Sequence, residues 1–335
     1  MPDCHLSGRP FLAELSSDGV KLLMTTGLSG MGFDQLYAMA FDTAHSVVYL
    51  AGDVESTVFF ATPSAAQASF GGGDTDAFVS RVDLTLQPTV AASCVVNSAS
   101  YFAGNTGSFP TGAVAPGEIV SLFGVGLGPA AGVSLQLTGA GTVSTSLGGT
   151  QVLFDGVPAP LLYAANGQVN AVVPFSVKAP STAMTVQRGA STAGPVPMPV
   201  VDAVPAIFLC GLACADASQA AALNSDYSLN TVSNPAARGD YITLFACGAG
   251  LMSSNVDGAV TPQLPPYPLP QLPVTATIRG VAAQVLYAGA APGFVSGALQ
   301  VNIRIPAGID FGSHVPVSIQ VGSFTSQTNV TIAVK

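Results

Sequence analysis

The sequence has little charge, no tryptophan and no long apolar run. Charged residues make up 8% of the 335, with nine Lys and Arg against eighteen Asp and Glu. The basic residues are scattered singly, so no positive stripe can follow a phosphate backbone, and nucleic acid is not expected as a partner. Every apolar run is cut by Pro, Gly or a polar residue before the roughly 18 residues of a membrane span, so no transmembrane segment is predicted.

Histidine is scarce as well, which narrows the enzymatic chemistry that can be expected. The three histidines are His5, His45 and His314. A nucleophile and base pair needs an imidazole or an equivalent base beside Ser or Cys, and His314 is predicted to be an exposed turn residue without partners. Glycosidases need two carboxylates in one cleft, whereas acids such as Glu118 and Asp240 are dispersed. The chain is therefore predicted not to be an enzyme.

The number of cysteines is odd, and their spacing does not match a structural metal site with paired CxxC motifs. They are Cys4, Cys94, Cys210, Cys214 and Cys247. Cys210 and Cys214 could close a small disulfide loop in an oxidising compartment. Separate buried or loop thiols are the alternative, and the sequence leaves both open.

Glycine and proline are abundant, with 37 and 25 residues. Together with much Ser, Thr and Val, this composition favours short strands and tight turns over long helices, and it predicts an all-β chain. The length is sufficient for two or three domains. Low charge with many Ser, Thr, Asn and Gln residues is typical of exported bacterial surface proteins, so an extracellular or cell-surface location is expected.

A repeat of about 67 residues occupies the N-terminal part, where Phe11 to Leu15 is echoed by Phe78 to Val82. Two more strands are predicted at Tyr37 to Asp42 and at Val47 to Gly52. The phrases YAMAFD, VVYLAG and GGGDTDAFVSRVD resemble the bacterial SBBP β-propeller repeat, which implies about one propeller blade within residues 10–86. Asp74 and Asp76, beside three glycines, could bind Ca²⁺; a purely structural turn is the favoured interpretation because no twelve-residue calcium loop follows.

A second duplication begins near residue 90. The segment 116–128 aligns with 238–250, the segment around 152–163 aligns with 277–287, and Gln-Val-Asn before a Pro occurs at 168–174 and again at 300–306. Short strands at regular spacing with turn residues between them predict an antiparallel sandwich in each copy. The predicted fold is thus two tandem immunoglobulin-like β-sandwiches, at 91–205 and 206–335, preceded by a partial β-propeller-like segment at 1–90.

Residues 94–335 resemble the uncharacterised Solibacter-type C-terminal domain family, whose halves have an immunoglobulin-like fold akin to IPT/TIG domains. The phrases that carry the resemblance are VVNSAS, VAPGEIVSLFGVGLGP, LGGTQVLFDGVPAPLLYAANGQVNAVVPF, NPAARGDYITLFACGAG and VLYAGAAPGFVSGALQVNIRIPAG. The resemblance implies a surface or secreted location at the end of a larger protein. It implies no activity and no catalytic residues.

The function expected from the sequence is a non-enzymatic structural or adhesion module, in which the sandwiches act as spacer or docking domains. The alternative is a polysaccharide-binding module of an exported protein, with a cell-surface protein or a polysaccharide as the partner. That alternative requires the aromatic rings of Tyr267 and Phe294 to lie on one face, where they could stack on sugars. Tyr163 and Tyr287, which are equivalent in the two copies, are predicted to pack in the cores.

Overall fold

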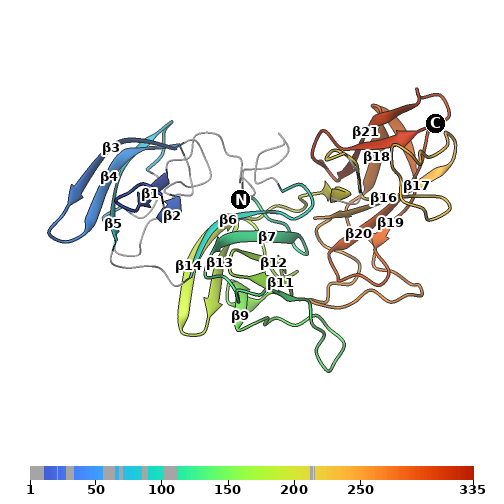
Figure 1. The fold of residues 1–335 in the computed structure, drawn as a ribbon. Helices are drawn as coiled ribbons and strands as arrows, with labels where there is room; N and C mark the ends of the chain where they lie inside the picture. Colours follow the sequence, from blue (N-terminus) through green and yellow to red (C-terminus); the bar gives the residue numbers. More distant parts are fainter. Residues whose placement is uncertain are drawn as a thin grey trace.

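The computed structural model describes residues 11–20, 22–27, 34–55, 65–67, 71–84, 90–101, 112–211, 214 and 216–335. All the secondary-structure elements in these ranges are β-strands, arranged in antiparallel sheets, and the predicted all-β fold class is confirmed (Figure 1). None of the described residues forms a helix long and apolar enough to cross a membrane.

The N-terminal segment, blue in Figure 1, consists of two small sheets. One pairs β1 (Phe11–Leu15) with β2 (Leu22–Gly27), and the other has the order β3 (Asp34–Asp42), β4 (Val47–Val54) and β5 (Asp76–Asp83). Among the described residues of this segment, their buried cluster comprises Leu12, Val48 and Leu50. Large apolar side chains such as Tyr37 and Met39 stay exposed, because so few strands cannot cover both faces of a sheet.

The first sandwich is built from two facing sheets. One has the strand order β6-β7-β12-β11-β8 and the other has the order β10-β9-β13-β14. The strands are β6 (Ala91–Asn97), β7 (Ile119–Val125), β8 (Val133–Ser134), β9 (Thr150–Phe154), β10 (Val157–Pro158), β11 (Leu161–Ala165), β12 (Gln168–Val172), β13 (Ser181–Arg188) and β14 (Ser191–Pro199). Inward residues of both sheets, including Leu122, Val169, Phe154 and Met184, form one buried cluster. This is the arrangement that alternating strand patterns predict.

The second sandwich repeats this plan. Its central path runs β15-β17-β20-β19-β18-β21-β22, with β16 beside β17 and β23 beside β21. The strands are β15 (Ala206–Ile207), β16 (Ala222–Asn224), β17 (Tyr241–Cys247), β18 (Val274–Ile278), β19 (Val281–Ala290), β20 (Ala298–Arg304), β21 (Gly312–Val321), β22 (Phe324–Thr325) and β23 (Thr331–Val334). Its buried cluster includes Leu244, Val301, Ile278 and Ile319.

The duplication seen in the sequence is visible in local geometry. A β-bulge directly precedes Tyr163 in the first copy and Tyr287 in the second. The side-chain amide of Gln168 donates to Asn170 at 2.8 Å, and that of Gln300 donates to Asn302 at 3.0 Å. The turns that follow β9 and β18 also match, since Asp155-Gly156 and Arg279-Gly280 all have positive φ.

The copies differ where the chain passes from one sheet to the other. In the second sandwich, the ten-residue β19 pairs with β18 at its start and with β20 further along, so one strand belongs to both sheets. In the first sandwich, Pro158 and Pro160 replace residues of that strand. Proline has no backbone N–H to donate to a ladder, and the strand is accordingly divided into β10 and β11.

Candidate functional site

The two sandwiches meet in a buried contact that has both an apolar and a polar part. The apolar part is a cluster drawn from both copies, which includes Ile119 and Val172 from the first and Val295 and Ala298 from the second. The polar part centres on Asn97, which donates to the carbonyl of Val204 at 3.1 Å. A buried contact of this mixed type holds two domains in a defined arrangement.

Glu118 lies inside the polar part and is only 1% exposed. Its carboxyl group accepts hydrogen bonds from Asn97 Nδ2 and from the backbone N–H of Ala115, both at 2.9 Å. Burial outweighs these bonds and raises the pKa of Glu118 to about 8, because the charged form is poorly solvated there. Burial therefore favours the protonated form of this carboxyl group.

The equivalent residue of the second copy, Asp240, has a different environment. Its carboxylate accepts from Ser225 Oγ at 2.5 Å and from the backbone N–H of Tyr241 at 2.8 Å, and these bonds lower its pKa. The two positions are thus equivalent in sequence but not in electrostatics. Of the two acids, only Glu118 lies in the contact between the sandwiches.

A groove with a volume of about 1150 Å³ opens over this contact. Both sandwiches supply its walls, and aromatic rings are prominent among them. The described lining residues from the first sandwich are Ser98, Ala99, Tyr101, Ile119, Leu135, Leu137, Val143, Leu162 and Asn170. Those from the second include Phe208, Leu209, Cys214, Ala217, Phe245, Val260, Phe294, Val295 and Leu299. The groove is therefore apolar over most of its surface.

The two aromatic residues proposed as sugar ligands do not share this groove. Phe294 lines it, is 53% exposed and packs against Phe245 with ring centroids 5.7 Å apart. Tyr267 is absent from the lining residues; its hydroxyl donates to the carbonyl of Gln263 at 3.0 Å and its ring makes an edge contact with Tyr287. The platform that the sequence predicted is thus represented in the groove by Phe294 alone.

The tyrosines at the equivalent bulges are not core residues, contrary to the prediction. Tyr163 and Tyr287 are both half-buried and belong to none of the buried clusters. The Tyr287 hydroxyl donates to the carbonyl of Ala290 at 2.9 Å, and partial burial raises its pKa to about 12. A β-bulge precedes each tyrosine and shifts the strand register there, which alternation alone could not predict.

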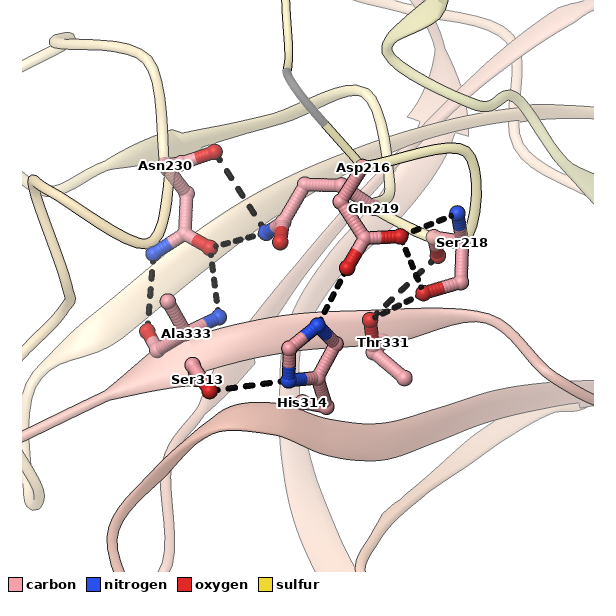
Figure 2. A network of polar contacts seen from close by, with 8 residues as sticks. All are labelled: Asp216, Ser218, Gln219, Asn230, Ser313, His314, Thr331 and Ala333. Atoms are coloured by element: carbon pink, nitrogen blue, oxygen red, sulfur yellow. Dashed lines mark hydrogen bonds and ion pairs between the residues drawn. The ribbon is translucent and has the colours of Figure 1, made fainter.

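His314 is neither a turn residue nor without partners, and this corrects the sequence prediction. It lies in β21, where Nε2 contacts the carboxylate of Asp216 and Nδ1 is 2.8 Å from the hydroxyl of Ser313 (Figure 2). The other oxygen of Asp216 accepts from the N–H and the hydroxyl of Ser218, and these bonds are the main cause of its lowered pKa. Asp216 is 98 residues away in the chain, a separation at which sequence patterns give no signal.

The same network continues into the sandwich. Ser218 Oγ lies 3.1 Å from the hydroxyl of Thr331, and the buried Gln219 donates to Asn230 Oδ1 at 2.8 Å (Figure 2). Asn230 in turn bonds both backbone groups of Ala333. The network therefore fastens the segment after the Cys210 to Cys214 loop onto the C-terminal strands.

Ser313, His314 and Asp216 are the residue types of a hydrolytic triad, but their arrangement suits a structural clamp. Ser313 directly precedes His314 in the same strand, and none of the three lines the groove. A triad needs its nucleophile beside a substrate cleft and beside donors that stabilise an oxyanion. What these side chains do here is cross-link β21 to the segment that begins at Asp216.

Asp76 and Asp74 occupy the glycine-rich turn predicted as a possible calcium site. The carboxylate of Asp76 accepts from the backbone N–H of Gly71, which closes the turn, while Asp74 is exposed. Among the residues that the structure describes, no group of three or more His, Cys, Asp or Glu could hold a metal ion. The turn is thus stabilised by hydrogen bonding within the chain.

Of the cysteines, Cys210 and Cys214 form a disulfide, which decides between the two alternatives left open by the sequence. Cys214 also lines the groove. Cys247 is a buried free thiol, and its burial raises the pKa to about 12. Cys4 lies outside the described residues.

Comparison with known proteins gives only remote likenesses. No protein-family model matches the chain, and no curated protein matches it. The full extracellular region of plexin A4 matches with a TM-score of 0.24 and 9% identity, over 73% of this chain and 18% of that chain. SGBP-B from a complex xyloglucan utilization locus in Bacteroides uniformis matches with a TM-score of 0.22 and 9% identity, over 72% of this chain and 49% of that chain. The γ-CGTase of alkalophilic Bacillus clarkii matches with a TM-score of 0.25 and 10% identity, over 87% of this chain and 36% of that chain. The chain spans less than half the length of each.

Proposed function

We propose that this chain is a non-catalytic structural or adhesion module of an exported protein, and that its paired sandwiches act as a spacer or docking unit. The observation that carries the proposal is the buried contact around Asn97 and Glu118, which joins the two copies through apolar packing and through the hydrogen bond from the Cys247 thiol to Asn97. A spacer must hold its domains at a defined angle, and a buried contact does this better than a free linker.

An extracellular or cell-surface location is part of the proposal. A disulfide such as that between Cys210 and Cys214 persists in oxidising compartments and is rare in the cytosol. The low fraction of charged residues and the resemblance of residues 94–335 to the Solibacter-type domain family support the same location. Surface labelling of intact cells with a membrane-impermeant lysine reagent, followed by mass spectrometry of Lys178 and Lys335, tests the location directly.

Polysaccharide binding is the second candidate, and exposure of the Phe294 ring favours it. Sugars combine stacking on aromatic rings with many hydrogen bonds from their hydroxyls. Among the described lining residues, only Tyr101, Ser98 and Asn170 have polar side chains apart from cysteine, so few such bonds are available. The structural and docking role is therefore the better supported of the two.

A pull-down with bacterial envelope fractions and with a panel of insoluble polysaccharides separates these candidates. The docking proposal expects saturable binding to envelope fractions that survives exhaustive glycosidase treatment of the fraction and is lost after protease treatment. Binding to purified polysaccharide that is reduced by Phe294→Ser would support the second candidate. Hydrolysis of ester or glycoside substrates that disappears in His314→Gln would overturn the non-catalytic proposal.

A further inference from the structure

We propose that the groove between the sandwiches binds a small, uncharged, mostly apolar molecule that carries a hydrogen-bond acceptor. This site is independent of the spacer role, because it follows from the groove's walls and not from the location or the partners of the chain. The groove lies directly over the contact between the sandwiches and takes its walls from both. Clefts between domains are a preferred place for small-molecule sites.

Exposed apolar side chains converge on the groove. Leu135, Leu137, Val260 and Phe294 are all exposed and all line it, and Tyr101 joins them with 49% of its surface exposed. Single exposed apolar residues are normal on a protein surface, whereas a contiguous set facing one cavity marks a binding surface. Water in such a groove finds few hydrogen-bonding partners, so an apolar molecule that displaces it gains free energy.

The absence of charge in the walls selects an uncharged ligand. Among the described residues that line the groove there is no Asp, Glu, Lys, Arg or His. A charged ligand would lose its hydration on entry and find no opposite charge to replace it. The net charge of −9 on the whole chain further disfavours anions.

Asn170 supplies the polar specificity. Its side-chain oxygen accepts from Gln168 at 2.8 Å, and this bond leaves the amide N–H₂ group of Asn170 to donate. The equivalent Asn302 makes the same bond to Gln300 but does not line the groove, so only the first copy presents this donor to a ligand. A carbonyl, ester or hydroxyl oxygen on the ligand would accept from it.

The scarcity of polar groups argues against an extended peptide. Each peptide residue brings a backbone N–H and a backbone C=O that must be satisfied when buried. The described walls offer the hydroxyl of Ser98, which is already paired with Ser121 Oγ at 2.8 Å, the hydroxyl of Tyr101 and the amide of Asn170. A compact molecule with one or two polar atoms can satisfy its hydrogen bonds with these few groups. The groove volume of about 1150 Å³ is large enough to hold such a molecule.

The test uses two neutral fluorescent probes and the full chain. Nile red is apolar and has a carbonyl oxygen, whereas pyrene is apolar and has no acceptor. We expect both to bind saturably with a blue shift or gain in emission. Phe294→Ser should weaken the binding of both probes by roughly tenfold, because it removes a large apolar contact. Asn170→Leu should weaken the binding of Nile red severalfold and leave the binding of pyrene unchanged.

Phe311→Ser is the matched control. Phe311 is 70% exposed and does not line the groove, so its replacement changes surface apolarity without touching the site. Thermal unfolding of each variant establishes that the fold is retained. The proposal is overturned if wild-type protein leaves Nile red emission unchanged, or if Phe311→Ser weakens binding as much as Phe294→Ser. Neither result bears on envelope binding, so the spacer proposal is judged separately.

Discussion

The thiol of Cys247 donates to the side-chain oxygen of Asn97 across 3.4 Å, and this bond joins a strand of the second sandwich to a strand of the first. Both the oxygen and the N–H₂ group of the Asn97 side chain are thereby hydrogen-bonded, since the N–H₂ group also donates to Glu118 and to the carbonyl of Val204. One asparagine thus orients a carboxyl group, a thiol and a backbone carbonyl within the contact. The stability of the contact should depend on each of them.

Cys247 should be unreactive in the native protein. The thiolate is the nucleophile in alkylation, and burial raises the pKa of this thiol to about 12. We expect iodoacetamide at pH 8 to leave the Cys247 peptide unmodified in native protein and to modify it completely in denaturant, as measured by peptide mass spectrometry. Rapid modification under native conditions would mean that the sandwiches separate readily.

Stability should fall as pH rises from about 4.5 to about 8. In the folded chain Glu118 loses its proton only as the pH approaches about 8, whereas in the unfolded chain it ionises near its ordinary pKa of 4.5. The unfolded state therefore binds fewer protons, and the free energy of unfolding should decrease by up to about 1.4 kcal/mol per pH unit. Urea unfolding monitored by circular dichroism at pH 5, 6, 7 and 8 measures this slope.

The variant Glu118→Gln should abolish that slope. The N–H₂ group of the introduced glutamine would face another donor, either Asn97 Nδ2 or the Ala115 N–H, so one hydrogen bond is lost. This loss should lower the free energy of unfolding at pH 5 by about 1–3 kcal/mol. Asp240→Asn is the control at the equivalent position. The pKa of Asp240 is lowered, so its contribution is lost only as pH falls through the acid range, and the slope above pH 5 should be that of the wild type.

Replacing both cysteines of the disulfide by serine should lower the free energy of unfolding by about 2 kcal/mol, the loop-closure value for so short a loop. Chemical unfolding of the wild type and of Cys210→Ser/Cys214→Ser measures the difference. A double variant as stable as the oxidised wild type would show that the disulfide does not constrain the unfolded chain.

The clamp at Asp216 should control local opening of its segment. Asp216→Ala removes the acceptor for the N–H of Ser218 and the partner of His314, so hydrogen exchange at the Ser218 amide should accelerate. His314→Gln leaves the bond from the Ser218 N–H to Asp216 in place, so hydrogen exchange at the Ser218 amide should accelerate much less. Equal acceleration in both variants would indicate that His314, and not the turn around Asp216, holds the segment.

The fold could be predicted from the sequence because its signals are local. Alternating apolar residues, turn glycines and the repeated Gln-Val-Asn phrase are each contained within a few residues, and the paired geometry at Gln168 and Gln300 follows from them. The Asp155-Gly156 turn was equally visible, since a residue pair that tolerates positive φ is typical of tight hairpins.

The candidate site could not be predicted in the same way. The groove exists only because two sandwiches meet, and that contact joins residues such as Asn97 and Cys247 that are 150 positions apart. The environment of Glu118 could not be predicted for the same reason, because it depends on Asn97 and on burial at the contact between the sandwiches. Phe294 is exposed and lines the groove, but the partner expected for it, Tyr267, contacts Tyr287 instead.

The second sandwich has one continuous strand, β19, where the first has two short strands, β10 and β11, and this difference has a mechanical consequence. In the second sandwich a single strand, β19, is hydrogen-bonded in both sheets, so the two layers are tied together along one continuous ladder. In the first sandwich the layers are joined at this point only through the proline-interrupted segment. We therefore expect the two sheets of the first sandwich to shift relative to each other more easily than those of the second.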